Sequence, residues 1–372
     1  MSLHILILIY EYPPIGGGAG VIASWQAKYF AELGHRVSVV TSAPPKPVDF
    51  EETPNLEVVR LPTYRPHFFK SGIREKLDWT RAAKRYLKVT GWGNYDFCMA
   101  HFSIPGGLAA FNSPIPMGII SHGHDIPWAY PKMMFGYHLL LYPLIRSIVA
   151  KSRVLWVQSE EMERNARRFM AEHTVHKIPN GGFPNSSDVL TDLSKRPLRL
   201  LFAGRLVQQK RPDILLEMMR ILKNKDVELS IAGDGPLLQK VKKVAEKNSL
   251  KIDFLGLISR DSMPKILRSH DVLIAPSEFE GMSISVLEAL FAGLYVVASR
   301  ASGNPDVIEG TNLGKLVDLD AQKFAEAVLG ILEAPSENEA RIFAWHTLRQ
   351  SHHWKEIARQ YLVDIEKITS QP

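Results

Sequence analysis

The sequence predicts two α/β domains, each built on a doubly wound parallel sheet. Its 372 residues exceed the size at which a single hydrophobic core usually stops growing. Short apolar runs alternate with helical stretches, and the runs are continuous, as expected for strands that are buried on both faces. A turn-rich break at residues 180–188 is followed by a second series of the same pattern, so we place the domain boundary there.

The first series of elements extends from the N-terminus to residue 178. A glycine-rich loop follows the first strand and leads into a helix near residues 21–33. Strands and helices then keep alternating, which is the pattern of a parallel sheet with crossover helices. The expected strands are residues 3–10, 37–41, 56–61, 95–100, 117–120, 153–157 and 175–178.

The second series begins at residue 198, and the chain is helical after Gly314. The expected strands are residues 198–203, 227–232, 252–254, 272–275, 295–298 and 315–317. The expected helices are residues 211–222, 236–247, 263–269, 283–291, 321–332, 337–347 and 353–368. We therefore expect one domain at 1–188 and another at 189–351, with a C-terminal helix, 352–372, that packs back on the first. Ligands of such open sheets bind at the carboxyl ends of the strands, so we expect the two domains to face each other across one cleft.

The composition excludes several classes of protein. The apolar fraction of 45% and the charged fraction of 23% are typical of a water-soluble globular protein. Cys98 is the one cysteine, which excludes an internal disulfide framework and fits a reducing compartment. The apolar N-terminus lacks a basic leader and meets Glu11 too early for a signal peptide, and residues 133–150 are too short and too interrupted to span a bilayer. We predict a cytoplasmic protein.

The net charge of +6 favours an anionic partner. Positive charge is concentrated in residues 70–88, where apolar side chains are interleaved with it. This segment is either a basic amphipathic helix that touches the inner face of an anionic membrane or an ordinary surface helix with a solvated basic face. Nucleic acid is the least favoured partner, because the other cations of interest stand on loops beside carboxylates. The basic residues of the segment are Lys70, Arg74, Lys76, Arg81, Lys84, Arg85 and Lys88.

The glycines after the first strand allow a charged group of a ligand to approach the backbone. Gly16, Gly17, Gly18 and Gly20 stand between that strand and a helix, where open N–H groups favour an anion. Their spacing fits the dinucleotide fingerprint poorly, and no acidic residue ends the second strand to hold a ribose. Both observations disfavour an oxidoreductase. A tight turn without a ligand is the alternative.

Polar side chains follow the strand at 117–120. The segment Ser121 to Asp125 contains His122 and His124, and a histidine beside a glycine and near a carboxylate can orient a hydroxyl or share a proton with it. The residues alone do not distinguish the two histidines. A loop histidine satisfied by its neighbours is the structural alternative.

The second domain places two cations after its first strand. Gly204 ends the strand, and Arg205 and Lys210 follow in the loop before the next helix. Arginine binds a phosphate through two hydrogen bonds and lysine binds it as a point charge, so the pair can hold a diphosphate. Taken on its own, this stretch favours the alternative of a basic surface loop.

Two glutamates flank the start of a later helix in the same domain. Glu280 lies in the loop after the strand at 272–275, and Glu288 lies inside the helix that begins near Ser283. We expect Ser283 to cap that helix, whose open N–H groups suit an anion, while the carboxylates suit hydroxyls such as those of a ribose. Together with Arg205 and Lys210, this pattern indicates a diphosphate attached to a hydroxylated ring.

The ordered set of motifs resembles the retaining glycosyltransferases of family 4, which have the two-domain GT-B fold. No single motif is specific, but the set runs in family order over nearly the whole chain. The matching stretches are Gly17-Gly18, Leu33-Gly34-His35, His122 to Asp125, Pro179-Asn180-Gly181, Gly204-Arg205 with Lys210, Gly233 to Pro236, Leu255-Gly256, Pro276-Ser277, Glu280 to Glu288, and Ala292-Gly293.

The resemblance implies the transfer of a hexose from a nucleoside diphosphate sugar, UDP- or GDP-linked, to a hydroxyl acceptor. Arg205 and Lys210 would hold the diphosphate at the strand end marked by Gly204 and would stabilise the leaving nucleotide. Glu288 would bind the ribose. Glu280 would hold the donor sugar together with the backbone of the residues that follow it, Gly281, Met282 and Ser283.

Other positions receive roles from the same resemblance. His122 would touch the donor sugar near the reacting carbon, Gly17 and Gly18 would let the backbone approach a phosphate or the acceptor, and Ile258 would lie near the base. Asp125 and Asn180, which stand in matching stretches, are counted with the substrate-binding residues. No metal and no other cofactor is expected, because the two cations of the diphosphate clamp replace a divalent ion.

Departures from the family pattern concern the acceptor side. Leu294 stands where the family often has proline, and Asn180-Gly181 is followed by Gly182 and Phe183 rather than valine and aspartate. The acceptor therefore stays open, with a lipid-linked molecule or a growing polysaccharide as the expectations. The alternatives are a nucleotide-sugar epimerase, a phosphorylase and a non-catalytic nucleotide-sugar-binding module.

Overall fold

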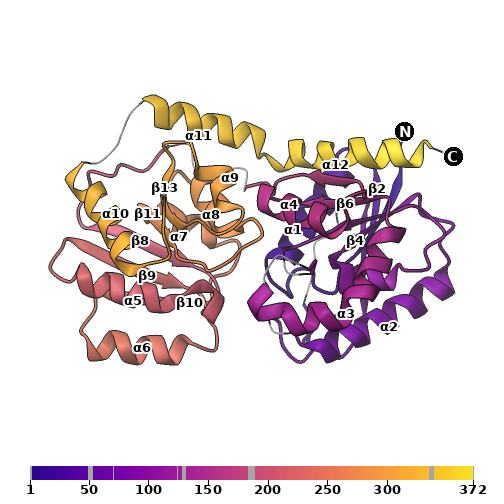
Figure 1. Cartoon of the computed structure of the whole chain (residues 1–372), viewed down its shortest axis with the longest axis horizontal. Helices are drawn as coiled ribbons and strands as arrows, with labels where there is room; N and C mark the ends of the chain where they lie inside the picture. Colours follow the sequence, from indigo (N-terminus) through magenta and orange to yellow (C-terminus); the bar gives the residue numbers. More distant parts are fainter. Residues whose placement is uncertain are drawn as a thin grey trace. The chain divides into compact units, whose positions relative to one another are not determined.

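The structure is a computed structural model that describes residues 2–48, 53–69, 71–123, 125–127, 131–182, 189–334 and 339–371. The chain divides into two compact units (Figure 1). The first unit comprises Met1–Asn180 and Trp354–Pro372, and the second comprises Gly181–His353. The boundary that we expected, between residues 188 and 189, borders residues 183–188, which lie outside the described part.

The described part of the first unit contains a 7-stranded parallel sheet in the order β3-β2-β1-β4-β5-β6-β7. The order reverses between β1 and β4, which makes the carboxyl ends of these two strands the topological switch point. The strands are β1 (His4–Leu8), β2 (Arg36–Ser42), β3 (Leu56–Leu61), β4 (Phe97–His101), β5 (Met117–Ile120), β6 (Val154–Val157) and β7 (Val175–Lys177). The helices are α1 (Gly18–Glu32), α2 (Ile73–Thr90), α3 (Pro131–Lys151), α4 (Glu160–Phe169) and α12 (Trp354–Thr369), and a π-helical turn, η1 (Phe102–Gly107), follows β4.

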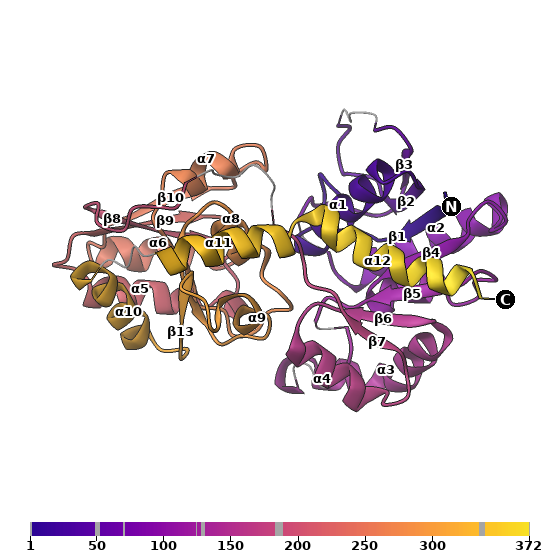
Figure 2. The ribbon, with the colours of Figure 1, turned by 90° about the horizontal axis from the view of Figure 1, so that it is seen from above.

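The C-terminal helix α12 is part of the first unit. It packs against α1, as Figure 2 shows, and Trp354 stacks on Trp25 with ring centroids 6.5 Å apart. Farther along the helix, the carboxylate of Asp364 accepts a hydrogen bond of 2.8 Å from Nε1 of the buried Trp156 on β6. The last helix thus completes the core of the unit that contains the N-terminus.

The second unit holds a 6-stranded parallel sheet in the order β10-β9-β8-β11-β12-β13. Its switch point lies between β8 and β11. The strands are β8 (Leu198–Ala203), β9 (Val227–Ala232), β10 (Ile252–Gly256), β11 (Val272–Ala275), β12 (Tyr295–Ser299) and β13 (Gly314–Val317). The helices are α5 (Pro212–Ile221), α6 (Leu238–Lys247), α7 (Met263–Arg268), α8 (Ile284–Phe291), α9 (Asn304–Ile308), α10 (Ala321–Glu333) and α11 (Glu339–Ser351), with a 3₁₀ turn, η2 (Gln208–Lys210), before α5.

Alternate side chains of the second sheet enter two separate cores. Leu200 and Phe202 of β8 pack into a core formed with α5, α6 and α10, whereas Leu201 packs into a core formed with α8 and α11. Both faces of the strand are therefore apolar, which explains why its sequence reads as a continuous hydrophobic run.

The predicted strands are all present, with ends that differ from the prediction by no more than two residues. The fold class is confirmed as two Rossmann-like parallel sheets. Within the described residues, no helix combines the length and the apolar character that a bilayer-crossing helix needs.

Candidate functional site

The loops that follow β8 and β11 bring one predicted cation, Lys210, to one predicted carboxylate, Glu280. These strands are neighbours at the switch point, so the loops at their carboxyl ends are adjacent. Lys210 of the first loop forms an ion pair with Glu280 of the second. Both side chains are largely shielded from solvent, with 18% of Lys210 and 11% of Glu280 exposed.

Backbone and amide contacts hold the two loops in register. Nε2 of Gln209 donates a hydrogen bond of 2.8 Å to the carbonyl of Phe279, and the N–H of Glu278 donates one of 2.8 Å to the carbonyl of Gln209. Gln209 immediately precedes Lys210, so these bonds hold the two loops, and with them Lys210 and Glu280, in place. The sequence alone did not identify this glutamine as part of the site.

The β8 loop also packs tightly on the loop that follows β9. The N–H of Gly204 donates to the carbonyl of Ala232 at 2.9 Å, and a side chain at Gly233 would collide with the carbonyl of Gly204. Glycine is therefore required at 233 by close backbone approach. Arg205 extends from this rigid loop as an exposed cation that pairs with no described carboxylate.

The segment Gly281 to Ser283 connects Glu280 to helix α8. The carbonyl of Gly281 accepts a hydrogen bond of 2.9 Å from the N–H of Gly303, and the side chain of Met282, the middle residue of the segment, is buried. Ser283 occupies the position just before α8, but the prediction that its hydroxyl caps the helix is wrong. Its Oγ lies 3.1 Å from Oγ of Ser285 instead, because that hydroxyl is a nearer partner than the backbone N–H groups.

Glu288 lies on α8 and is buried among apolar side chains. Nη2 of Arg260, in the loop after β10, lies 3.6 Å from its Oε1. Burial disfavours the charged carboxylate and raises the pKa of Glu288 to about 7, although Arg260 opposes that shift. Ile258 stands two residues before Arg260 and is partly buried against the core that contains α8. Arg260 is a site residue that sequence reasoning missed.

In the first unit, the structure pairs His122 with a second histidine. His101 ends β4, and its Nδ1 lies 3.0 Å from Nε2 of His122 while the two rings stack at 5.2 Å. His101 is fully buried, which lowers its pKa to about 3 and keeps its ring neutral. His124, the other candidate, lies outside the described residues.

Asp125 holds the loop that carries His122. Its carboxylate accepts hydrogen bonds from the N–H of Ser103 at 2.8 Å, from Oγ of Ser121 at 2.7 Å and from the N–H of His122 at 2.9 Å. The side chain is buried, so these contacts define a positioning role for Asp125 in this structure. The partner Ser103 follows β4, and its part was not visible from the sequence.

The glycine loop after β1 contains two kinds of glycine. Gly16 has φ +94 and packs against the side chain of Glu11, and a Cβ at Gly20 would lie 2.9 Å from the carbonyl of Glu11. These two glycines are required by packing. A Cβ at Gly17 would meet no atom within 4 Å, and α1 begins at the next residue, Gly18, without a side-chain cap. The open space at the helix start therefore lies over Gly17.

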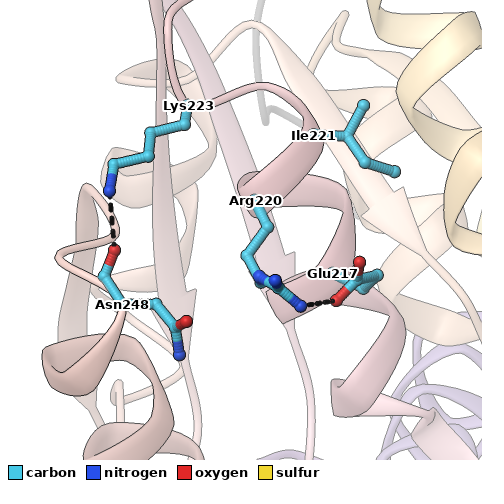
Figure 3. Close-up of a pocket in the computed structure, with 5 residues that line it drawn as sticks. All are labelled: Glu217, Arg220, Ile221, Lys223 and Asn248. Carbon is cyan, nitrogen blue, oxygen red and sulfur yellow. Dashed lines mark hydrogen bonds and ion pairs between the residues drawn. The ribbon is translucent and has the colours of Figure 1, made fainter.

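A surface hollow of about 360 Å³ in the second unit is unrelated to these loops (Figure 3). It lies where α5 and α6 end, next to the starts of β9 and β10, whereas the loops described above follow the ends of the strands. Two of its polar contacts are internal, since Arg220 pairs with Glu217 at 2.8 Å and Lys223 donates to the carbonyl of Asn248 at 3.2 Å. The remaining predicted residue, Asn180, is buried at the last position of the first unit.

Two Rossmann-like units, each with a parallel sheet, are the architecture of the GT-B fold. A family profile described as Glycosyltransferase Family 4 matches residues 16–181, and one described as Glycosyl transferases group 1 matches residues 197–334. The chain belongs to the family 4, group 1 glycosyltransferases, and it is an enzyme of that type.

Known proteins of similar sequence and fold agree with this assignment. The N-acetyl-alpha-D-glucosaminyl L-malate synthase of Bacillus anthracis is 25% identical over 354 residues, which cover 90% of this chain and 88% of that protein. The structure of sucrose-phosphate synthase from Thermosynechococcus elongatus is similar with a TM-score of 0.84 over 100% of both chains, at 18% identity. That of Anabaena Alr3699/HepE, in complex with UDP and glucose, is similar with a TM-score of 0.76 over 98% of this chain and 100% of the other, also at 18% identity.

Proposed function

We propose that this glycosyltransferase moves a hexose from a nucleoside diphosphate sugar to a hydroxyl acceptor, with retention of the anomeric configuration. The observation that carries the proposal is the Lys210–Glu280 ion pair, with Arg205 exposed on the same loop. A diphosphate bound there would receive two hydrogen bonds from the arginine and a point charge from the lysine. Both cations would stabilise the negative charge that develops on the leaving nucleotide.

The glutamates have separate roles in this proposal. Glu280 orients Lys210 and accepts hydrogen bonds from sugar hydroxyls, together with the backbone of Gly281 to Ser283. Glu288 binds the ribose, and its burial beside Arg260 keeps its carboxyl in one place. The positive charge of the cations at the diphosphate would replace that of a divalent ion, so we propose that transfer needs no metal.

The first unit contributes the pair of histidines, His101 and His122, and the open helix start at Gly17. His122, held by His101 and by the Asp125 loop, is proposed to contact the donor sugar near the reacting carbon. An imidazole can orient a sugar hydroxyl through a hydrogen bond. Asn180 and Ile258 remain proposed substrate contacts, the latter near the base.

The donor base is proposed to be uracil or guanine. The Anabaena neighbour was solved with UDP and glucose, which supports UDP as the first nucleotide to test. A thermal-shift comparison of UDP, GDP and their hexose conjugates would decide, because a ligand that binds the native state raises its melting temperature. Stabilisation by none of these nucleotides would contradict the proposal.

Contact with an anionic membrane is a further part of the proposal, and it rests on helix α2. The helix buries Trp79 and Leu87 but leaves 74% of Ile73 and 41% of Leu77 exposed beside its basic residues. Exposed apolar and basic side chains together suit an anionic lipid surface. Lys70, the first basic residue of the segment, lies outside the described residues. Failure to bind anionic vesicles at low salt would contradict this contact, and with it a lipid-linked acceptor at the inner face of the membrane.

Assays of the reaction separate transfer from the alternatives. A transferase releases the nucleoside diphosphate only as the sugar leaves for an acceptor or water, an epimerase returns an isomeric nucleotide sugar, and a binding module changes neither. Measurement of free UDP after incubation with UDP-glucose and a hydroxyl acceptor therefore identifies a transferase, and analysis of the recovered nucleotide sugar for an isomer separates an epimerase from a binding module. Transfer to inorganic phosphate would indicate a phosphorylase.

A further inference from the structure

We propose that Arg65 and Lys76 form an anion subsite in the first unit that binds a phosphate or carboxylate group of the acceptor. The identity of the ligand as the acceptor rests on the proposed function, whereas the binding of an anion does not. The subsite lies beside the glycine loop, at the carboxyl edge of the first sheet.

Arg65 is a buried cation with an unused hydrogen-bond donor. It is 5% exposed, although arginine is rarely buried without a partner. Its Nε donates to the carbonyl of His67 and its Nη2 to the carbonyl of Phe68, each at 3.1 Å. Its Nη1 is also buried and meets no hydrogen-bond acceptor among the described residues. Nitrogen donors in such positions are costly unless a ligand or water satisfies them.

Lys76 brings a second cation to the same place. It extends from α2 so that its Nζ lies 5.4 Å from the centre of the Tyr10 ring, and Cζ of Arg65 lies 5.7 Å from the centre of that ring. Lys76 is half-buried, and its burial lowers its pKa, while Glu11 and Asp125 favour its charged form. Neither cation has a described carboxylate at ion-pair distance.

Carboxylates act on both cations beside the ring of Tyr10. Among the described residues, Glu11 interacts with Arg65 and Lys76, and its burial raises its pKa. Glu75 also interacts with Arg65. Asp125 also influences Lys76, but its carboxylate already accepts three hydrogen bonds. The buried Nη1 of Arg65 still lacks an acceptor among the described residues, and an anionic ligand beside Lys76 would supply one.

The position of the subsite fits a substrate group. The N–H of Gly16 donates to the carbonyl of Phe68 at 2.8 Å, so the loop that carries Arg65 is joined to the glycine loop. A Cβ at Gly17 would meet no atom within 4 Å, and the N–H of Gly17 faces the carboxyl of Glu11. Asp125, which acts on Lys76, also holds His122, so the anion subsite and the histidine proposed to contact the sugar belong to one edge of the sheet.

The test compares Lys76→Gln with Lys84→Gln, an exposed position on the same helix that serves as the matched control. Inorganic phosphate and, separately, succinate are titrated calorimetrically into the full chain at constant ionic strength. Anion binding elsewhere is common to both variants, so the difference isolates Lys76. We expect Lys76→Gln to weaken binding at least tenfold for the preferred anion, with Lys84→Gln unchanged and the melting temperature without anion retained. Arg65→Lys, which keeps the charge but loses the fork of donors, should also weaken binding.

Equal anion affinity in the two glutamine variants would overturn the subsite. A second arm measures sugar transfer to a hexose phosphate and to the neutral hexose. We expect kcat/KM for the phosphate to fall at least tenfold in Lys76→Gln and that for the neutral sugar to stay constant; equal loss for both acceptors would also overturn the proposal. If the anion binds through Lys76 but the wild type transfers no sugar, the subsite stands and the proposed function fails.

Discussion

The two units hold their charged side chains in different ways. In the second unit, Lys210 is paired with Glu280 and its loop is hydrogen-bonded to the neighbouring loop through Gln209. In the first unit, Arg65 and Lys76 surround Tyr10 without a described carboxylate at ion-pair distance. One unit thus has a cation that is fixed in advance, and the other has a buried arginine with one N–H group that meets no acceptor among the described residues.

This difference matches the two kinds of substrate that a glycosyltransferase binds. The nucleotide part of the donor is the same in every turnover, and a rigid, preorganised clamp for it costs no rearrangement. Similar proteins are named for different products: the Bacillus anthracis relative for a glucosaminyl L-malate and the Thermosynechococcus neighbour for sucrose phosphate. We therefore expect the cations of the first unit to determine which acceptor this chain selects.

The largest expected effect concerns the exposed cation of the second unit. Arg205→Ala should lower the turnover number by about 10²–10³-fold, because a preorganised donor to the leaving group is lost. The measurement is the rate of UDP release from UDP-glucose with acceptor present. Lys240→Ala, at an exposed position on α6, is the control and should keep the wild-type rate. An unchanged rate in Arg205→Ala would show that Arg205 does not stabilise the leaving diphosphate.

The next effect is a dependence of stability on pH from Glu288. Its pKa is raised from 4.5 to about 7, so its contribution to stability is fully present below pH 4.5 and is lost as the pH rises through 7. The difference corresponds to about 3 kcal/mol at most. Glu288→Gln cannot ionise, so at pH 8 its free energy of unfolding should exceed that of the wild type, while UDP binding weakens. Parallel denaturant titrations at pH 5 and pH 8 check this, and identical pH dependence in both proteins would contradict it.

A smaller effect separates the paired cation from an ordinary surface ion pair. Lys210→Met and Glu280→Gln should each destabilise the second unit, and the double variant should lose less than the sum. The coupling energy expected for two contacting side chains is about 0.5–3 kcal/mol. The exposed pair Arg220–Glu217 is the comparison, and its coupling should stay below about 1 kcal/mol. Equal coupling in both pairs would show that the clamp is not preorganised.

The smallest effect distinguishes the two kinds of glycine in the first unit. Gly16→Ala should destabilise the fold by about 1–2 kcal/mol, because residue 16 has a left-handed φ of +94 and packs on Glu11. Gly17→Ala should leave the melting temperature unchanged but raise KM about tenfold, which corresponds to about 1.4 kcal/mol. Steady-state kinetics and thermal unfolding of the two variants test this. A Gly17→Ala enzyme with wild-type KM would show that no substrate uses the open space.

The sequence predicted the strands well because burial on both faces leaves a local signal. Leu200, Leu201 and Phe202 are all apolar although they enter different cores, and any window over them reads as a buried strand. The meeting of Lys210 with Glu280 was also predictable, since each lies in a loop after a strand and strand ends of a parallel sheet meet at one edge.

Contacts made between distant segments were not predictable. His101 meets His122 and Arg260 meets Glu288 only because β4 lies beside β5 and the loop after β10 reaches α8. The capping prediction for Ser283 was wrong because the choice between the backbone and Ser285 depends on side-chain rotamers. The sequence did not predict the burial of Arg65, because that burial is a consequence of the fold.

The central claim is that the loop containing Arg205 and Lys210 binds the diphosphate of a nucleotide donor. Calorimetric titration of UDP and GDP into the wild type, Lys210→Ala and Lys240→Ala tests it most directly. We predict saturable binding of one nucleotide to the wild type and to Lys240→Ala, with affinity at least tenfold weaker in Lys210→Ala. Equal affinity in all three proteins, or no binding of either nucleotide, would contradict the account.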